Sequence, residues 1–387
     1  MKVLIYSKKN SLQPIGGPIG YLYNLSYGLK KIKDNEIYFL ESAKKGPSFK
    51  SKIKNQIPSN VWGALQLAKE ILGTIVSDGK EYGHSFNEYD AVHFHSTADL
   101  YKNRELLKNY TGKIILTSHT PEAPYLEKRD LMKAKKLPKN IILKISKKLK
   151  KIDIYSFMRA TDIIFPCKEA VEPYLNTFEF FRNNYKKLEK KITYLPTGII
   201  SEEHIVPEKK LLDSNTFRVC YIGRHNTIKG YDLLKEAAER IEKLDKNIQF
   251  IIAGKQGPLY SNNSLKNWRE LGWTNKPLEI EAACNLFVLP NRETYFDLAL
   301  IEALSAPVVV LISKTGGNKY FERFKTNAIN FFEPDDVDDL VNKILFIKKY
   351  CNTNQLKQEN KVIFKKNFTA EIFAKNYVST IRSIVES

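Results

Sequence analysis

The chain has 387 residues, 43% of them hydrophobic, which suits two globular domains and excludes large-scale disorder. It carries a formal net charge of +19, of which +16 falls within residues 1–198. No apolar run approaches the ~20 residues of a membrane-spanning helix, and the first run is too short for a secretory signal. The four scattered cysteines have no metal or disulfide spacing, as is usual for a cytosolic protein. The basic first half predicts a polyanionic partner, either a membrane surface or nucleic acid.

Short segments rich in Ile, Val, Leu and Phe alternate with helical patterns along the chain. We expect strands at 2–6, 36–40, 91–95, 113–117, 162–166 and 192–196, and then at 217–223, 248–254, 286–290, 307–312 and 328–332. Apolar runs separated by helices are typical of parallel strands that are buried on both faces. The sequence therefore predicts an α/β protein with two doubly wound, Rossmann-like domains. We place the domains at 1–198 and 199–367, and residues 368–387 form a final helix that packs back towards the first domain.

A basic segment stands out between Glu127 and Lys151, where eleven residues are basic and two are acidic. Within it, Ile141, Ile145, Leu149 and Ile152 recur at helical spacing. One interpretation is a helix that faces an anionic membrane through Lys139, Lys144, Lys147, Lys148 and Lys151. The other is an ordinary surface helix whose lysines are solvated.

Two glycines and a histidine follow predicted strands of the first domain. Gly16 and Gly17 would let the backbone approach a phosphate or sugar closely. His119 follows the strand at 113–117, and strand ends of doubly wound sheets point into the ligand crevice. His93 and His95 share one strand face, but no third ligand at a telling spacing accompanies them, so we interpret both as structural.

The second domain opens with "VCYIGRHNTIKGYDLL", in which a strand ends at a glycine and two cations precede a helix. The N–H groups at the helix start, together with Arg224 and Lys229, would suit an anionic ligand. An acidic run, "PDDVDDL", comes where a later helix begins, and we interpret it as a helix cap. We therefore predict neither a metal nor another cofactor.

With "SHT", "GRHNTIKG", "IIAGKQGP" and "TYFDLALIEALS" in this order, almost the whole chain resembles the GT-B glycosyltransferases of the family 4 type. The resemblance implies two Rossmann-like domains that face each other across a cleft. It implies an acceptor-side first domain and a second domain that binds a nucleotide-sugar. It also implies that Arg224 and Lys229 grip the donor diphosphate and that Glu302 holds the ribose hydroxyls.

The chain departs from the family's paired-glutamate motif. The first glutamate would fall at Thr294, Glu293 comes one residue early, and Asp297 replaces a glycine. Glu293 or Asp297 could take the missing role, or Thr294 could bind a different sugar. By resemblance the catalytic residues are His119, Arg224, Lys229 and Glu302. The donor-binding residues are Gly16, Gly17, Gly223, Arg224, Lys229, Gly254, Glu293, Thr294, Tyr295, Phe296, Asp297, Leu298 and Glu302.

The resemblance implies a retaining glycosyltransferase that uses a nucleotide diphosphate sugar, with UDP as the expected nucleotide. The expected acceptor is a glycan or a lipid-linked sugar of bacterial surface polysaccharide synthesis, at the inner face of the membrane. Three alternatives stay open: an epimerase or hydrolase of the same fold, a non-specific nucleic-acid-binding protein, and a non-catalytic relative. The chain lacks nucleic-acid-binding signatures, so we expect no nucleic-acid partner.

Overall fold

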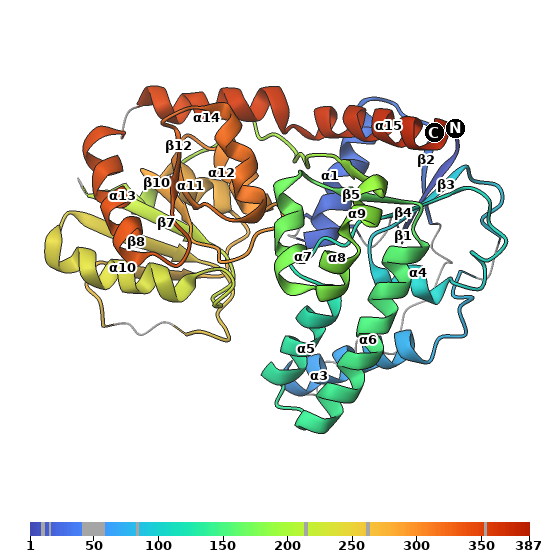
Figure 1. Ribbon diagram of the computed structural model, residues 1–387. Helices are drawn as coiled ribbons and strands as arrows, with labels where there is room; N and C mark the ends of the chain where they lie inside the picture. The colour runs from blue at the N-terminus through green and yellow to red at the C-terminus, as the bar shows by residue number, and fades with distance from the viewer. Residues whose placement is uncertain are drawn as a thin grey trace.

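A computed structural model describes residues 1–8, 12–14, 17–40, 59–82, 85–212, 216–260, 264–351 and 354–387. Two six-stranded sheets, whose paired strands are all parallel, lie side by side, each covered by helices (Figure 1). This arrangement confirms the predicted α/β fold with two doubly wound domains. No helix in the described parts of the chain is long and apolar enough to cross a membrane.

The first sheet has the order β2-β1-β3-β4-β5-β6. Its strands are β1 (Val3–Lys8), β2 (Ile37–Leu40), β3 (Ala91–Phe94), β4 (Lys113–Leu116), β5 (Asp162–Phe165) and β6 (Ile192–Tyr194). The second sheet has the order β12-β11-β10-β7-β8-β9. Its strands are β7 (Phe217–Ile222), β8 (Ile248–Ala253), β9 (Trp268–Gly272), β10 (Leu286–Leu289), β11 (Val309–Ser313) and β12 (Ile329–Phe332).

Helices connect the strands of each sheet. The first domain contains α1 (Gly17–Lys31), α3 (Ser59–Ile75), α4 (Thr97–Lys102), α5 (Pro124–Ala134), α6 (Lys139–Arg159), α7 (Glu172–Thr177), α8 (Glu179–Asn183) and α9 (Tyr185–Leu188). The second contains α10 (Tyr231–Leu244), α11 (Pro277–Ala282), α12 (Leu298–Ser305), α13 (Val337–Tyr350) and α14 (Asn354–Asn367), followed by α15 (Ala370–Glu386). Short 3₁₀ helices lie at Glu169–Val171, Glu189–Lys191, Lys209–Leu211 and Gly316–Phe324.

Each sheet has a point at which the strand order reverses. In the first sheet β1 lies between β2 and β3, and in the second β7 lies between β10 and β8. The loops on either side of such a point diverge above the carboxyl ends of the strands and leave a crevice. In the second domain these are the loops after β7 and β10, which carry Arg224, Lys229 and the segment from Glu293 to Asp297.

The C-terminal helix α15 crosses back to the first domain and packs against α1 (Figure 1). Its residues Phe373, Tyr377 and Ile381 are buried in one cluster with residues of β1 and α1. Where the chain crosses between the domains, the Ile199 N–H donates to the Phe368 carbonyl at 2.8 Å. The two connecting segments therefore run side by side.

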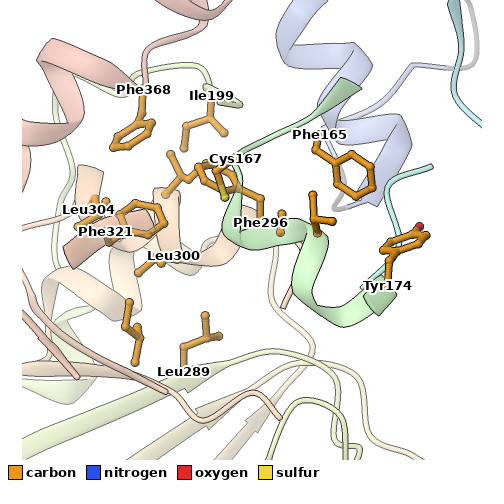
Figure 2. Packing of buried hydrophobic residues seen from close by; sticks show 14 of the residues in the cluster. Phe165, Cys167, Tyr174, Ile199, Leu289, Phe296, Leu300, Leu304, Phe321 and Phe368 are labelled. Atoms are coloured by element: carbon orange, nitrogen blue, oxygen red, sulfur yellow. The ribbon is translucent and has the colours of Figure 1, made fainter. Parts of the chain in front are cut away.

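One hydrophobic cluster continues across both domains. Figure 2 shows Phe165, Cys167 and Tyr174 of the first domain beside Phe296 and Phe321 of the second. All five side chains are at most 9% exposed. Burial of this much apolar surface between the domains stabilises their packing against each other.

Helices α3, α5 and α6 project away from the first sheet (Figure 1). Ile71 of α3, Met132 of α5, and Ile142 and Leu149 of α6 are buried together. The apolar stripe predicted for α6 was wrong at its first residue, because Ile141 is 42% exposed and Ile142 faces inwards. The apolar face of α6 thus packs on neighbouring helices.

Candidate active site

The candidate site begins at the carboxyl ends of β7 and β8, where Gly223 and Gly254 follow the two strands. The Gly223 N–H donates to the Ala253 carbonyl at 3.0 Å. Gly254 has a φ of +135°, and a Cβ there would lie 1.9 Å from the Gly223 carbonyl oxygen. Only glycine fits this contact, so Gly254 serves the packing of the two strand ends.

The β7–α10 loop lies against the end of β10. Gly230 caps α10 with a φ of +64°, and a Cβ there would lie 1.7 Å from the Pro290 carbonyl oxygen. The Asn226 side-chain oxygen accepts a hydrogen bond from the Lys229 N–H at 2.8 Å. This loop geometry brings Lys229 to the β10–α12 loop.

Lys229 meets Asp297 at the start of α12. Its ammonium group forms an ion pair with the Asp297 carboxylate, which also accepts from the Asn291 amide at 3.0 Å and from the Ala299 N–H at 3.3 Å. Burial alone would raise the pKa of Asp297, but the Lys229 charge and these hydrogen bonds outweigh it and lower the pKa. Asp297 is therefore an ionised N-cap that holds Lys229 in the crevice.

Arg224 lies in the same loop, and its side chain is exposed. Its backbone carbonyl accepts from the Tyr221 hydroxyl at 2.7 Å, which fixes the loop. Within the described residues the Arg224 guanidinium has no ion pair. It can therefore bind an anionic ligand without breaking an internal contact.

Glu302 lies one turn along α12 from Asp297. Burial, and then the negative charges of Asp297 and Glu202, raise the pKa of Glu302 to about 7. The carboxylate is thus poised between its two protonation states near neutral pH. Cations close to a bound donor would favour the ionised form, which accepts hydrogen bonds from hydroxyl groups.

Glu293 faces the first domain. Burial, and then the charge of Glu172 on α7, raise the pKa of Glu293, and one of its carboxylate oxygens is buried without a hydrogen-bond partner. Glu172 itself pairs with Lys319 of the second domain at 2.6 Å. Burial and neighbouring carboxylates also raise the pKa of Glu122 in the β4–α5 loop to about 7. Glu293 thus belongs to a group of carboxylates between the domains.

Three neighbouring residues that were predicted to bind the donor have side chains with contacts inside the protein. Thr294 is 2% exposed, and its hydroxyl accepts from the Asn291 amide at 2.9 Å. The Tyr295 hydroxyl reaches across to the first domain and donates to the Ile164 carbonyl at 3.3 Å. Phe296 is buried in the cluster of Figure 2. A donor could meet these residues mainly through their backbone. Leu298 follows as the first, half-buried residue of α12 and packs on the same cluster.

Three histidines lie together at the carboxyl edge of the first sheet. His95 Nδ1 is 2.8 Å from His119 Nε2, and the rings of His93 and His95 lie 4.1 Å apart. His93 also contacts the Tyr377 hydroxyl of α15 at 2.8 Å. The place of His119 beside this pair was not predicted from the sequence. No group of three His, Cys, Asp or Glu side chains in the described ranges could hold a metal ion.

His119 has an unusual backbone conformation and a half-buried side chain. Its φ is 60°, a strained value for a residue other than glycine. Burial lowers its pKa to about 3, so the imidazole is neutral at physiological pH. A neutral ring bonded to His95 suits a positioning role better than that of a general acid.

The remaining predicted residues fall at the edges of the site or far from it. Gly17 begins α1 with a φ of +75° and open space around it, whereas Gly16 lies outside the described residues. The predicted membrane-facing residues are all exposed on α6: Lys139, Lys144, Lys147, Lys148 and Lys151. In the acidic run, Asp336 caps α13 by accepting from the Asp339 N–H at 2.8 Å.

Two doubly wound domains with a cationic strand-end crevice in the second define the GT-B class of fold. Residues 216–349 match the family described as glycosyl transferases group 1. The match covers the second sheet and the loops that hold Arg224, Lys229, Asp297 and Glu302.

A curated relative and two solved structures extend this result. The UDP-Gal:alpha-D-GlcNAc-diphosphoundecaprenol alpha-1,3-galactosyltransferase of Escherichia coli is 27% identical over 194 residues, which cover 45% of this chain and 50% of the relative. The chain thus matches about half the length of that relative. Sucrose-phosphate synthase from Thermosynechococcus elongatus superposes with a TM-score of 0.64 at 16% identity, covering 99% of both chains. Anabaena HepE in complex with UDP-glucose superposes with a TM-score of 0.61 at 14% identity, covering 99% of this chain and 100% of the other. At such identities the two structures show the fold alone.

Proposed function

We propose that this protein is a retaining glycosyltransferase of the family 4 type that transfers a sugar from a UDP-sugar to a glycan or lipid-linked acceptor. The observation that carries the proposal is the meeting of Lys229, Asp297 and the start of α12 at the switch point of the second sheet. Switch points are where open α/β sheets bind their ligands. The matched glycosyl transferases group 1 domain contains both loops.

Arg224 and Lys229 would neutralise the diphosphate as it leaves the sugar. Negative charge develops on this leaving group in the transition state, and a preorganised cationic site stabilises such charge best. The ionised form of Glu302 would accept hydrogen bonds from the ribose hydroxyls. A diphosphate oxygen would take the acceptor proton, so the protein needs no nucleophile and His119 positions the substrate. We propose that transfer needs no metal ion, because two cationic side chains serve the diphosphate.

The proposed acceptor side is the first domain, and the proposed place of action is the inner face of the bacterial membrane. The relative from Escherichia coli is named for a lipid-linked diphosphate acceptor, and the exposed lysines of α6 give this domain a basic surface. Lysines near an anionic leaflet each contribute about 1 kcal/mol to binding. We propose a role in surface polysaccharide synthesis on these grounds.

A panel of nucleotide-sugars tests the proposal directly. Donor binding raises the melting temperature by mass action, so the donor is identified as the compound that gives the largest shift in the presence of EDTA. Products are then analysed with and without a lipid-linked acceptor. Donor consumption that requires an acceptor supports transfer, whereas equal consumption without one would identify a hydrolase or epimerase. No shift with any nucleotide-sugar would contradict the proposal.

A further inference from the structure

A cavity of about 230 Å³ lies in the first domain between the ends of β3 and β4 and helices α3, α5 and α6. Its walls include Ile71, Leu149 and Ile152 on the apolar side and Thr97 and Thr120 on the polar side. Asp153 of α6 fixes the polar wall, because its carboxylate accepts from the Thr97 hydroxyl at 2.6 Å and the Tyr125 N–H at 2.8 Å. The cavity is therefore a built feature with both apolar and polar surface.

The cavity adjoins the proposed transfer site through one residue. His95 lines it and contacts His119, the strand-end residue of β4, at 2.8 Å. Parallel strands β3 and β4 are neighbours, so the loops after them open on the same edge of the sheet. A group held in the cavity would lie close to the strand-end face on which His119 lies.

His95 also leaves a hydrogen-bonding atom unused. The side chain is 5% exposed, and its Nε2 has no partner within the part of the chain that the structure describes. Burial, followed by the neighbouring His93 and His119, lowers the pKa of His95, so the ring is neutral. Nε2 then either donates or accepts, depending on the tautomer.

The charges around the cavity exclude one kind of ligand. Glu70 and Glu127 line it together with Lys128, the one lysine or arginine among the described lining residues. Lys128 is already paired with Glu70 at 2.7 Å. Among the described residues Glu127 has no ion pair and the cavity lining offers no free cation, so a phosphate or carboxylate would be repelled, whereas hydroxyl and amino groups would find acceptors.

We propose that this cavity binds the terminal sugar ring of a glycan acceptor, as a neutral or amino sugar without phosphate on that ring. The inference rests on the proposed transferase function and adds the place and chemistry of its acceptor. The volume suits a single ring, since cavities of about 150 Å³ already hold benzene. The apolar wall would cover one face of the ring and the polar wall its hydroxyls.

The test uses the whole protein and free monosaccharides, observed by saturation-transfer NMR. The probes are glucose, galactose and N-acetylglucosamine as neutral rings, glucosamine as the cation and glucose 6-phosphate as the anion. At least one neutral ring and glucosamine should bind, and glucose 6-phosphate should not. Ala98 lines the cavity, so the larger side chain of Ala98→Leu should fill part of it. The affinity for the sugar that binds best should fall at least about tenfold. Ala134→Leu, on an exposed residue of α5, is the matched control.

A second variant keeps the shape of a lining side chain and removes its negative charge. Glu127→Gln should reduce the preference for glucosamine over glucose, because the charge that attracts the ammonium group is lost. The inference is overturned if no neutral ring binds, if glucose 6-phosphate binds best, or if Ala98→Leu binds the probes as the unaltered protein does. UDP binding is measured on the same samples, so loss of the proposed function would appear separately as absent UDP binding.

Discussion

The ammonium group of Lys229 is paired with the carboxylate of Asp297, although the two residues are 68 positions apart in the chain. A cation proposed to bind a diphosphate is thus already held by an anion at the start of α12. The pair fixes Lys229 in the crevice, and donor phosphate must share or displace Asp297.

Replacement of Lys229 by alanine should lower the transfer rate by about two or more orders of magnitude, the scale of losing one charge-stabilising group. It also leaves Asp297 without its cation, which should destabilise the fold by about 1–3 kcal/mol. The double variant Lys229→Ala/Asp297→Asn should recover the melting temperature but not the rate. Near-normal turnover in Lys229→Ala would refute the role of this residue.

Replacement of Glu293 by alanine tests which residue takes the place of the missing glutamate. If Glu293 contacts the donor sugar, the variant should lose discrimination between donor sugars and keep its affinity for free UDP. Glu179→Ala, at an exposed residue of α8, is the control. A change in turnover of less than about twofold would exclude this role and favour Asp297.

Four lysines of α6 test the membrane proposal. Changing Lys144, Lys147, Lys148 and Lys151 to glutamate should abolish flotation with anionic vesicles, and added salt should weaken binding of the unaltered protein. The control changes four exposed lysines of the second domain: Lys243, Lys246, Lys365 and Lys366. Equal flotation of the α6 variant and the unaltered protein would contradict the proposal, and UDP binding should stay unchanged in both variants.

Glu302 should make stability depend on pH. Its pKa is about 7 in the folded protein against an ordinary 4.5, so the folded state keeps a proton that the unfolded state loses. The free energy of unfolding should therefore fall as pH rises from about 4.5 to 7. Glu302→Gln should remove roughly 1–2 kcal/mol of this fall, whereas Glu239→Gln, at an exposed residue, should not. Urea unfolding at pH 5 and pH 8 measures the free energy of unfolding of each variant. An equal change between the two pH values in Glu302→Gln and in the unaltered protein would argue against a raised pKa of Glu302.

The sequence predicted eleven of the twelve strands named here to within about two residues, because buried parallel strands carry unbroken apolar runs. It missed β9 (Trp268–Gly272), an edge strand in which Trp268 alone is fully buried. Helix α12 begins at Leu298 because the Asp297 side chain caps it. Edge strands and caps depend on local contacts that an apolar pattern does not contain.

The sequence places the candidate residues after strands but does not predict their contacts with one another. Arg224 and Lys229 follow one strand and Asp297 another, and only the strand order places those two strands side by side. The ion pair of Lys229 with Asp297 needs that tertiary arrangement. The contact of His95 with His119 could have been inferred, since both residues follow adjacent strands of the first sheet at the carboxyl edge.

The most direct test of the central claim is calorimetric titration of UDP into the protein in EDTA, comparing the unaltered chain with Arg224→Ala and Lys229→Ala. Arg269→Ala, on an exposed residue of β9, is the control. The account predicts that UDP binds without metal, that each site variant weakens binding at least about tenfold, and that the control does not. Undiminished binding by both site variants, or no binding by the unaltered protein, would contradict it.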